Sequence, residues 1–363
     1  MSVIVLSAGG TGGHLFPAQA LAGELARRGK RIVVMTDRRG RNYATAFPGA
    51  AVEIVPSAAF SDRSVFGLIA APFEIAAGVA TAFVKMLRIR PSAVIGFGGY
   101  PSVPVMIAAW LGGRATAILE QNAVTGRANR LVMNRVEKVA AAFPIARFAP
   151  KDSSKVVITG NPLRAEVTAL AGSPYEAPSA DGPLRLLVFG GSQGARALSD
   201  LVPAAIALLP AALQGRLSVV QQCRPEDIER VRIAYARAGV RAELAAFFGD
   251  LPARMARAQL VIARAGAGTV SELMAIGRPA ILIPLPHALD DNQTPNAEIL
   301  TRANAAWCAP ERELTPEKLA GMIKLAFSDP ADLARRAARA RSLARIDAVE
   351  RLADLAEDLA RAA

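Results

Sequence analysis

The stretch that decides the fold reads Val3-Ile4-Val5-Leu6-Ser7-Ala8-Gly9-Gly10-Thr11-Gly12-Gly13-His14, an apolar run that passes directly into a glycine-rich turn. A second stretch of this kind, in the other half of the chain, reads Leu184-Arg185-Leu186-Leu187-Val188-Phe189-Gly190-Gly191-Ser192-Gln193-Gly194. Each pattern predicts a strand, a tight turn and a helix. That arrangement offers backbone N–H groups and the positive end of a helix dipole to an anion. Two such stretches, a domain apart, predict two similar α/β domains that face one cleft.

Short apolar runs alternate with helical stretches through most of the chain. Because the runs are mostly continuous, they are typical of strands buried on both faces of a parallel sheet. We therefore predict an α/β fold with two Rossmann-like, doubly wound parallel sheets that bind ligands at the carboxyl ends of their strands. The predicted strands span residues 3–6, 31–35, 52–55, 93–96, 115–119, 136–142 and 156–159, then 186–189, 217–221, 260–263 and 280–284.

A polar stretch at 170–183, which contains Pro, Gly and Ser, is the expected passage between the domains. We place the first domain at 1–163 and the second at 164–340. The tail from Pro316 onward has a helical pattern, and its last part, about 341–363, is expected to pack back on the first domain.

Charge and composition restrict the partners. The 363 residues carry a formal net charge of +12, which favours anionic partners such as phosphorylated substrates or anionic lipid. Aromatic residues make up only 5% and no nucleic-acid motif is visible, so we expect no nucleic acid. Cys223, Cys308, His14 and His287 lack metal-ligand spacing, which disfavours a zinc site and favours a reducing compartment. We also expect no signal peptide, because the first residues lack a charged region.

The common nucleotide-binding fingerprints do not fit the glycine loops. In the G-x-G-x-x-G pattern, Leu15 takes the place of the third glycine in the first loop, and Ser271 takes it in a third loop at 264–269. The loop at 190–194 lacks the Gly-Lys-Ser/Thr of a Walker A motif. Taken alone, each loop has a plain tight turn as its alternative. Glu272 either holds ribose hydroxyls or is simply favoured by the helix dipole.

Seven motifs in order resemble one family nearly end to end, the peptidoglycan N-acetylglucosaminyltransferases of glycosyltransferase family 28. The resemblance implies a two-domain GT-B fold, a UDP-N-acetylglucosamine (UDP-GlcNAc) donor and no cofactor. The motifs are Thr11-Gly12-Gly13-His14, Gly96-Phe97-Gly98-Gly99-Tyr100, Glu120-Gln121-Asn122, Thr159-Gly160-Asn161-Pro162-Leu163-Arg164, Gly190-Gly191-Ser192-Gln193-Gly194, Arg264-Ala265-Gly266-Ala267-Gly268-Thr269, and Asp290-Asp291-Asn292-Gln293 with Asn296-Ala297.

The resemblance also implies where the donor binds. The nucleotide and its diphosphate would lie mainly on the second domain, with Phe248 near the uracil, Glu272 on the ribose and Gln293 on the sugar. One departure is Asn292, at a position where family members often carry His, and we give neighbouring His287 no catalytic role. The implied donor-binding residues are Thr11, Gly12, Gly13, Asn122, Arg164, Ser192, Gln193, Phe248, Ala267, Gly268, Thr269, Val270, Ser271, Glu272 and Gln293.

The implied reaction is an inverting transfer, in which the C4 hydroxyl of a lipid-linked N-acetylmuramoyl group attacks the anomeric carbon and UDP leaves. His14 is the first candidate for the base, because a neutral imidazole accepts a proton near pH 7. The alternative is that His14 only orients its loop. Glu120 is the rival base, with Tyr100 and Asn122 as acceptor-side contacts. No protein-held metal is expected, since Asp290-Asp291 is not Asp-x-Asp and helix N-termini can stabilise the leaving diphosphate.

A lipid-linked acceptor implies a membrane surface. The apolar and basic stretch at 65–90 is the expected docking segment, through Phe66, Leu68, Ile69, Phe73, Phe83, Lys85 and Arg88. An ordinary core helix and a spanning helix are the alternatives, although Pro72 and Glu74 interrupt a span. We therefore expect a peripheral protein on the cytoplasmic face of the bacterial plasma membrane, whose partners are the lipid-linked acceptor, anionic lipid and cell-wall synthesis proteins.

Three other functions remain open on the sequence. The first is a related GT-B transferase with another lipid acceptor or sugar nucleotide. The second is a nucleotide-sugar-binding membrane protein without turnover. The third, an NAD-dependent dehydrogenase, is disfavoured by the failed fingerprints.

Overall fold

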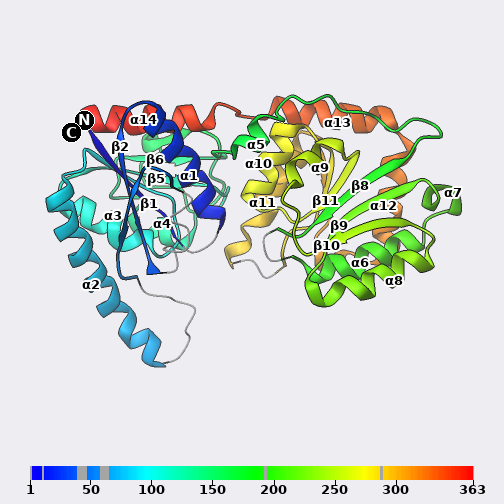
Figure 1. Cartoon of the computed structure of the whole chain (residues 1–363), viewed down its shortest axis with the longest axis horizontal. Helices are drawn as coiled ribbons and strands as arrows, with labels where there is room; N and C mark the ends of the chain where they lie inside the picture. The colour runs from blue at the N-terminus through cyan, green and yellow to red at the C-terminus, as the bar shows by residue number, and fades with distance from the viewer. Residues whose placement is uncertain are drawn as a thin grey trace. The chain divides into compact units, whose positions relative to one another are not determined.

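Two units, each built on one parallel sheet, make up the computed structural model, which describes residues 2–9, 12–38, 47–57, 65–191, 194–286 and 289–362 (Figure 1). The first unit comprises Met1–Arg164 together with Arg345–Ala363, and the second comprises Ala165–Ala344. Every strand pair in both sheets is parallel and consecutive strands are joined through helices or loops. The predicted class, two α/β domains with parallel sheets, is confirmed.

The first unit holds a seven-stranded sheet in the order β3-β2-β1-β4-β5-β6-β7. Successive residues of β1 enter different cores: Ile4 and Leu6 pack with α1 and α14, whereas Val5 packs with α2, α3 and α4. Helices thus cover both faces, which explains the continuous apolar runs. The elements are β1 Val3–Ser7, α1 Gly12–Arg27, β2 Arg31–Thr36, β3 Ala51–Ile54, α2 Val65–Ile89, β4 Ala93–Gly96, α3 Ser102–Leu111, β5 Ala115–Glu120, α4 Arg127–Val132, β6 Lys138–Ala141, the short 3-10 helix η2 Ser153–Lys155, β7 Val156–Ile158 and α14 Ala348–Ala362.

The second unit holds a six-stranded sheet in the order β10-β9-β8-β11-β12-β13. Residues of α6, α8 and α12 pack with β8 and β9 in one core. The elements are α5 Ala165–Thr168, β8 Leu184–Phe189, α6 Arg196–Ala207, α7 Ala211–Gln214, β9 Leu217–Gln222, η3 Pro225–Asp227, α8 Ile228–Arg237, β10 Arg241–Ala245, α9 Leu251–Arg257, β11 Leu260–Ala263, α10 Ala267–Ile276, β12 Ala280–Leu282, η4 Leu289–Asp291, α11 Gln293–Arg302, β13 Ala306–Cys308, η5 Glu311–Glu313, α12 Pro316–Ser328 and α13 Pro330–Ser342.

The polar stretch at 170–183 lies on the second unit rather than between the units. The guanidinium groups of Arg278 and Arg341 donate to the carbonyl oxygens of Pro174 and Ser173, at 2.9 and 2.5 Å. Tyr175 adds a hydroxyl bond of 2.8 Å to the Gln259 carbonyl. The stretch at 170–183 is therefore a surface segment of the second unit, held there by arginine side chains, and its polar composition does not mark a linker.

Helix α14, the last in the chain, packs on the first unit beside α1 (Figure 1). Its Leu352 is fully buried in the core that α1 shares with the sheet. Arg28 at the end of α1 pairs with Asp354 at 2.6 Å and with Glu357 at 3.0 Å, and Lys30 pairs with Glu357 at 2.9 Å. The last residues of the chain are therefore an integral layer of its first unit.

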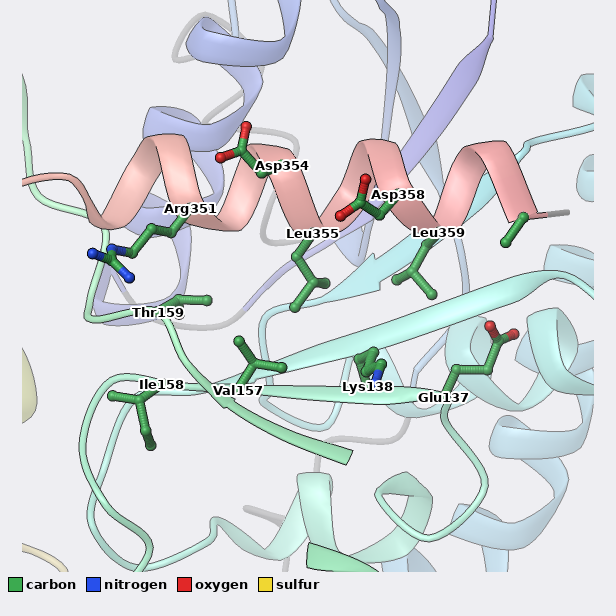
Figure 2. A pocket seen from close by; sticks show the side chains of 11 residues that line it. Glu137, Lys138, Val157, Ile158, Thr159, Arg351, Asp354, Leu355, Asp358 and Leu359 are labelled. Atoms are coloured by element: carbon green, nitrogen blue, oxygen red, sulfur yellow. The ribbon is translucent and has the colours of Figure 1, made fainter. Parts of the chain in front are cut away.

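Beyond α14 the sheet edge is partly uncovered. A cavity of about 490 Å³ lies between α14 and strands β6 and β7. Figure 2 shows Leu355 and Leu359 extending from the helix toward Val157 of the edge strand. Charged side chains of α14 and from the start of β6 surround these apolar residues. The helical layer on this face therefore ends before the sheet reaches its last strand.

Candidate functional site

His14 lies in the first turn of α1, just beyond the carboxyl end of β1. Its Nδ1 is 3.2 Å from Nε2 of Gln121, and the ring is also hydrogen bonded to the backbone of Phe97. Gly98 and Gly99 have φ values of +83° and +74°, and a Cβ on them would come within 3.3 and 3.4 Å of the imidazole. The glycine pair therefore leaves room for the ring. Burial lowers the pKa of His14 from 6.5, so its imidazole is neutral at pH 7.

Glu120 ends β5 and anchors the loop that follows it. One carboxylate oxygen accepts the backbone N–H of Asn122 at 2.9 Å. The other accepts the backbone N–H of Gly126 at 2.9 Å and the side-chain amide of Asn129 at 2.8 Å. Burial raises the pKa of Glu120, while these donors oppose the shift. Both oxygens are thus occupied within the unit, which supports an anchoring role more than a role as the base.

The remaining candidates of the first unit lie around this edge. Tyr100 and Asn122 are both half-buried. The Arg164 guanidinium lies 5.2 Å from the ring centre of Phe16, and so beside the first turns of α1. Gly12 begins α1 and Gly13 is exposed, whereas Thr11 falls outside the described residues.

A cavity of about 560 Å³ opens at the carboxyl edge of the second sheet. Its glycine loop follows β8, with φ of +86° at Gly191 and +65° at Gly194. A Cβ on Gly190 would come within 2.5 Å of the backbone nitrogen of Ala195, so the turn requires glycine there. The lining residues are Gly190, Gly191, Gly194, Ala195, Arg196, Ala197, Arg224, Arg264, Gly266, Thr269, Leu285, Gln293 and Glu311.

Only some residues of the third glycine loop and the helix after it line this cavity. Thr269, near the start of α10, lines it. Val270 is fully buried, and the Ser271 hydroxyl donates to the Ala267 carbonyl of its own helix at 2.8 Å. These buried residues shape the helix start. Gly268 is exposed and Glu272 half-buried on the same turns.

Gln293 joins two loops at the cavity. Its side-chain oxygen accepts the backbone N–H of Ala265 at 3.2 Å and that of Leu285 at 3.0 Å. The side-chain amide of Gln293 thus fixes the third glycine loop against the segment that follows β12. Ser192, Gln193 and His287 lie outside the described residues.

The two phenylalanines after β10 differ sharply. Phe248 is only 8% exposed, and the Arg254 guanidinium lies 4.4 Å from its ring centre. Phe247 is 74% exposed. The ring that is open for stacking is therefore Phe247, which the sequence analysis did not single out. The two residues are identical in type and adjacent in sequence, so only the burial in the structure distinguishes the open ring from the packed one.

Helix α2 carries an apolar stripe on its solvent side. Phe73, Ala77, Ala80, Val84 and Leu87 are all exposed and follow helical spacing. Phe83 is half-buried against the core, Lys85 pairs with Glu53, and Arg88 is exposed. Trp110 and Leu111 at the end of α3 are also exposed. Side chains 65–71, which include Phe66, Leu68 and Ile69, lie outside the description.

The described ranges contain neither a membrane-spanning helix nor a cluster of metal ligands. No helix there combines the length and the apolar character that a membrane crossing needs. No group of three or more His, Cys, Asp or Glu side chains there is arranged to hold a metal ion.

Comparison with known proteins identifies the family. The glycosyltransferase family 28 N-terminal domain matches residues 4–141, and the corresponding C-terminal domain matches residues 185–359. The chain belongs to glycosyltransferase family 28. Within it, a Rhodopseudomonas palustris protein is 48% identical over 99% of this chain and 98% of its own length. A Bradyrhizobium diazoefficiens protein is 48% identical over 97% of both chains. Both are named UDP-N-acetylglucosamine–N-acetylmuramyl-(pentapeptide) pyrophosphoryl-undecaprenol N-acetylglucosamine transferase.

Solved structures agree with this family 28 assignment. The crystal structure of Acinetobacter baumannii MurG matches with a TM-score of 0.82 and 31% identity, covering 99% of this chain and 100% of that one. A kitacinnamycin glycotransferase matches at a TM-score of 0.71 and 19% identity, covering 99% of each chain, which shows the shared fold alone. The resemblance and the GT-B fold inferred from the seven motifs are confirmed.

Proposed function

We propose that this chain transfers N-acetylglucosamine from UDP-GlcNAc to the C4 hydroxyl of the N-acetylmuramoyl group of undecaprenyl-diphospho-muramoyl pentapeptide, and so makes the disaccharide precursor of peptidoglycan. The observation that carries the proposal is the full-length similarity to relatives named for this transfer. The glycine-loop cavity in the second unit supports it, because backbone N–H groups beside a helix start suit a diphosphate.

For the chemistry, His14 is the proposed base. A neutral imidazole held by Gln121 and Phe97 has a fixed orientation and a nitrogen lone pair. In the transfer, a base takes the proton of the attacking hydroxyl as the new C–O bond forms and the bond to UDP breaks. Glu120, through Asn122 and Gly126, would hold the loop beside this base.

For the donor, we assign the diphosphate to the cavity of the second unit. Gly191, Gly194 and Thr269 line it. The exposed Phe247 ring is the proposed platform for the uracil, with buried Phe248 supporting the turn. Gln293 would reach the sugar from the loop junction that it already fixes.

For the acceptor, we propose that α2 and the end of α3 rest on the cytoplasmic surface of the plasma membrane. The exposed stripe from Phe73 to Leu87 would enter the interface, with Trp110 beside it. Arg88 and Arg135 are exposed cations suited to anionic headgroups. Cell-wall synthesis proteins acting on the same lipid are the proposed protein partners.

The test is transfer of radiolabelled GlcNAc from UDP-GlcNAc to a short-chain analogue of the lipid-linked acceptor, with EDTA present. Product with EDTA supports both the acceptor and leaving-group stabilisation by protein groups. If product forms only after magnesium is added, the transferase function stands, but stabilisation of the leaving group by protein groups alone is overturned. Binding of UDP-GlcNAc without product in either condition overturns the acceptor and favours a relative with another lipid acceptor.

A further inference from the structure

Arg224 follows β9 and lines the cavity of the second unit. Its side chain is half-buried and lies against the end of the glycine loop. A Cβ on Gly194 would be 3.1 Å from Arg224 Cγ and 3.6 Å from its backbone nitrogen. The arginine stem therefore crosses the loop at a glycine that leaves it room.

The other two arginines of this cavity already have partners. Arg264 donates to the carbonyl oxygens of Ile283 and Pro284 at 3.1 and 3.3 Å, and pairs with Glu311 at 2.5 Å. Arg196 is 72% exposed at its side chain and lies 4.0 Å from Asp200. Their guanidinium groups are thus either occupied or largely in water.

Arg224 differs from both. Among the described residues, neither its guanidinium nor its backbone N–H has a hydrogen-bond or ion-pair partner. Holding a long cationic side chain half-buried costs desolvation and rotamer freedom, which a counter-charge offsets. A planar guanidinium with a free fork of N–H groups matches the oxygens of a phosphate.

We propose that Arg224 binds the diphosphate of the nucleotide-sugar donor, with its guanidinium on phosphate oxygens beside the 190–194 loop. The assignment rests on the proposed donor. As the bond between the sugar and the diphosphate breaks, negative charge grows on the departing phosphate, and a cation already in place stabilises it. Arg224 is then a phosphate-binding residue that supplements the backbone N–H groups of the loop.

The experiment compares binding of UDP and of uridine by NMR titration in the full chain. Arg224→Gln is expected to weaken UDP binding about 10- to 100-fold, the effect of losing charge-assisted hydrogen bonds, while uridine binding stays unchanged. Arg224→Lys keeps the charge without the fork and should recover part of the loss. Arg232→Gln, on the exposed side of α8, is the matched control and should leave both affinities unchanged.

The outcomes separate the inference from the proposed function. Selective loss of UDP affinity in Arg224→Gln supports the inference, and retained uridine binding shows that the variant is folded. Unchanged UDP binding, or an equal loss for UDP and uridine, overturns it. Failure of the unmodified chain to bind either UDP or UDP-GlcNAc instead overturns the proposed donor.

Discussion

His14 carries the proposed proton transfer, and its surroundings give that role a pH signature. Burial lowers its pKa from 6.5, so the imidazole stays deprotonated, and competent as a base, down to a pH below that value. The acid limb of kcat should therefore fall below pH 6.5. His14→Ala should lower kcat by about 10²- to 10⁴-fold and abolish the limb.

The same variant distinguishes the base from an orienting histidine. Isothermal titration with UDP-GlcNAc should give an affinity within about twofold of the unmodified chain, since a base acts only in the transition state. Parallel loss of affinity and turnover would mean that His14 positions its loop. Gln121→Ala is the comparison variant, because it removes the amide that helps to orient the ring but keeps the imidazole itself.

Glu120 should behave as an anchor. Glu120→Gln replaces one acceptor oxygen with an amide donor opposite the donors of Asn122, Gly126 or Asn129. We expect a reduced kcat/KM for the acceptor with the acid limb of kcat unmoved. If that limb disappears in the variant, Glu120 is the base.

Stability against pH gives Glu120 a second readout. Its folded-state pKa is raised above 4.5, so the native chain binds its proton more tightly than the unfolded chain does. Its contribution to stability is therefore fully present below pH 4.5 and is lost as pH rises through the folded-state pKa. Urea unfolding from pH 4.5 upward should show the unmodified chain losing its advantage over Glu120→Gln. A constant difference across that range would contradict the raised pKa.

At the scale of elements, strands that form an apolar run are predictable from the sequence, and the two edge strands of the second sheet are not. Ile4, Val5 and Leu6 all enter a core, so β1 is one apolar run. In β10, by contrast, Arg241 and Glu243 are exposed and no apolar run forms. β13 is only three residues long. β10 escapes the prediction because its exposed charged residues interrupt the apolar pattern, and β13 because three residues are too few to form one.

The glycine loops were predictable for a related reason. Positive φ at Gly98, Gly191 and Gly194 restricts those positions to glycine, which leaves a mark in the sequence. The sequence does not show in the same way which neighbouring side chain faces the ligand. Phe247 and Phe248 are identical in sequence, and only burial separates the open ring from the packed one.

The exposed stripe of α2 should bind anionic membranes. The double variant Val84→Glu with Leu87→Glu should weaken co-sedimentation with phosphatidylglycerol vesicles by about tenfold or more, because two apolar side chains no longer enter the interface. Leu325→Glu, at an exposed position of α12, is the control with the same chemistry in the other unit. Transfer to a water-soluble acceptor should be unchanged. Equal vesicle binding by all variants would rule out this docking face.

For the whole molecule, the two units can be followed separately because each has one tryptophan, Trp110 in the first and Trp307 in the second. In a Trp307→Phe background, adding Leu352→Ala should destabilise the unit that Trp110 reports by about 2–5 kcal/mol, since Leu352 is fully buried. Urea titrations by fluorescence measure the change. The exposed Leu325→Ala should cost less than about 0.5 kcal/mol. A similarly small cost for Leu352→Ala would show that α14 is dispensable to the first unit.

The return of α14 to the first unit also sets the order in which the ribosome can complete the protein. The first sheet emerges early, but the layer that contains Leu352 is synthesised only after all of Ala165–Ala344. At bacterial and eukaryotic translation rates of 5–20 residues per second, that wait is roughly 10–35 s. During it, the apolar surface that α14 covers is open to chaperones and to other nascent chains. A stop codon ahead of the codon for Leu352 would therefore damage the half of the protein that was made first.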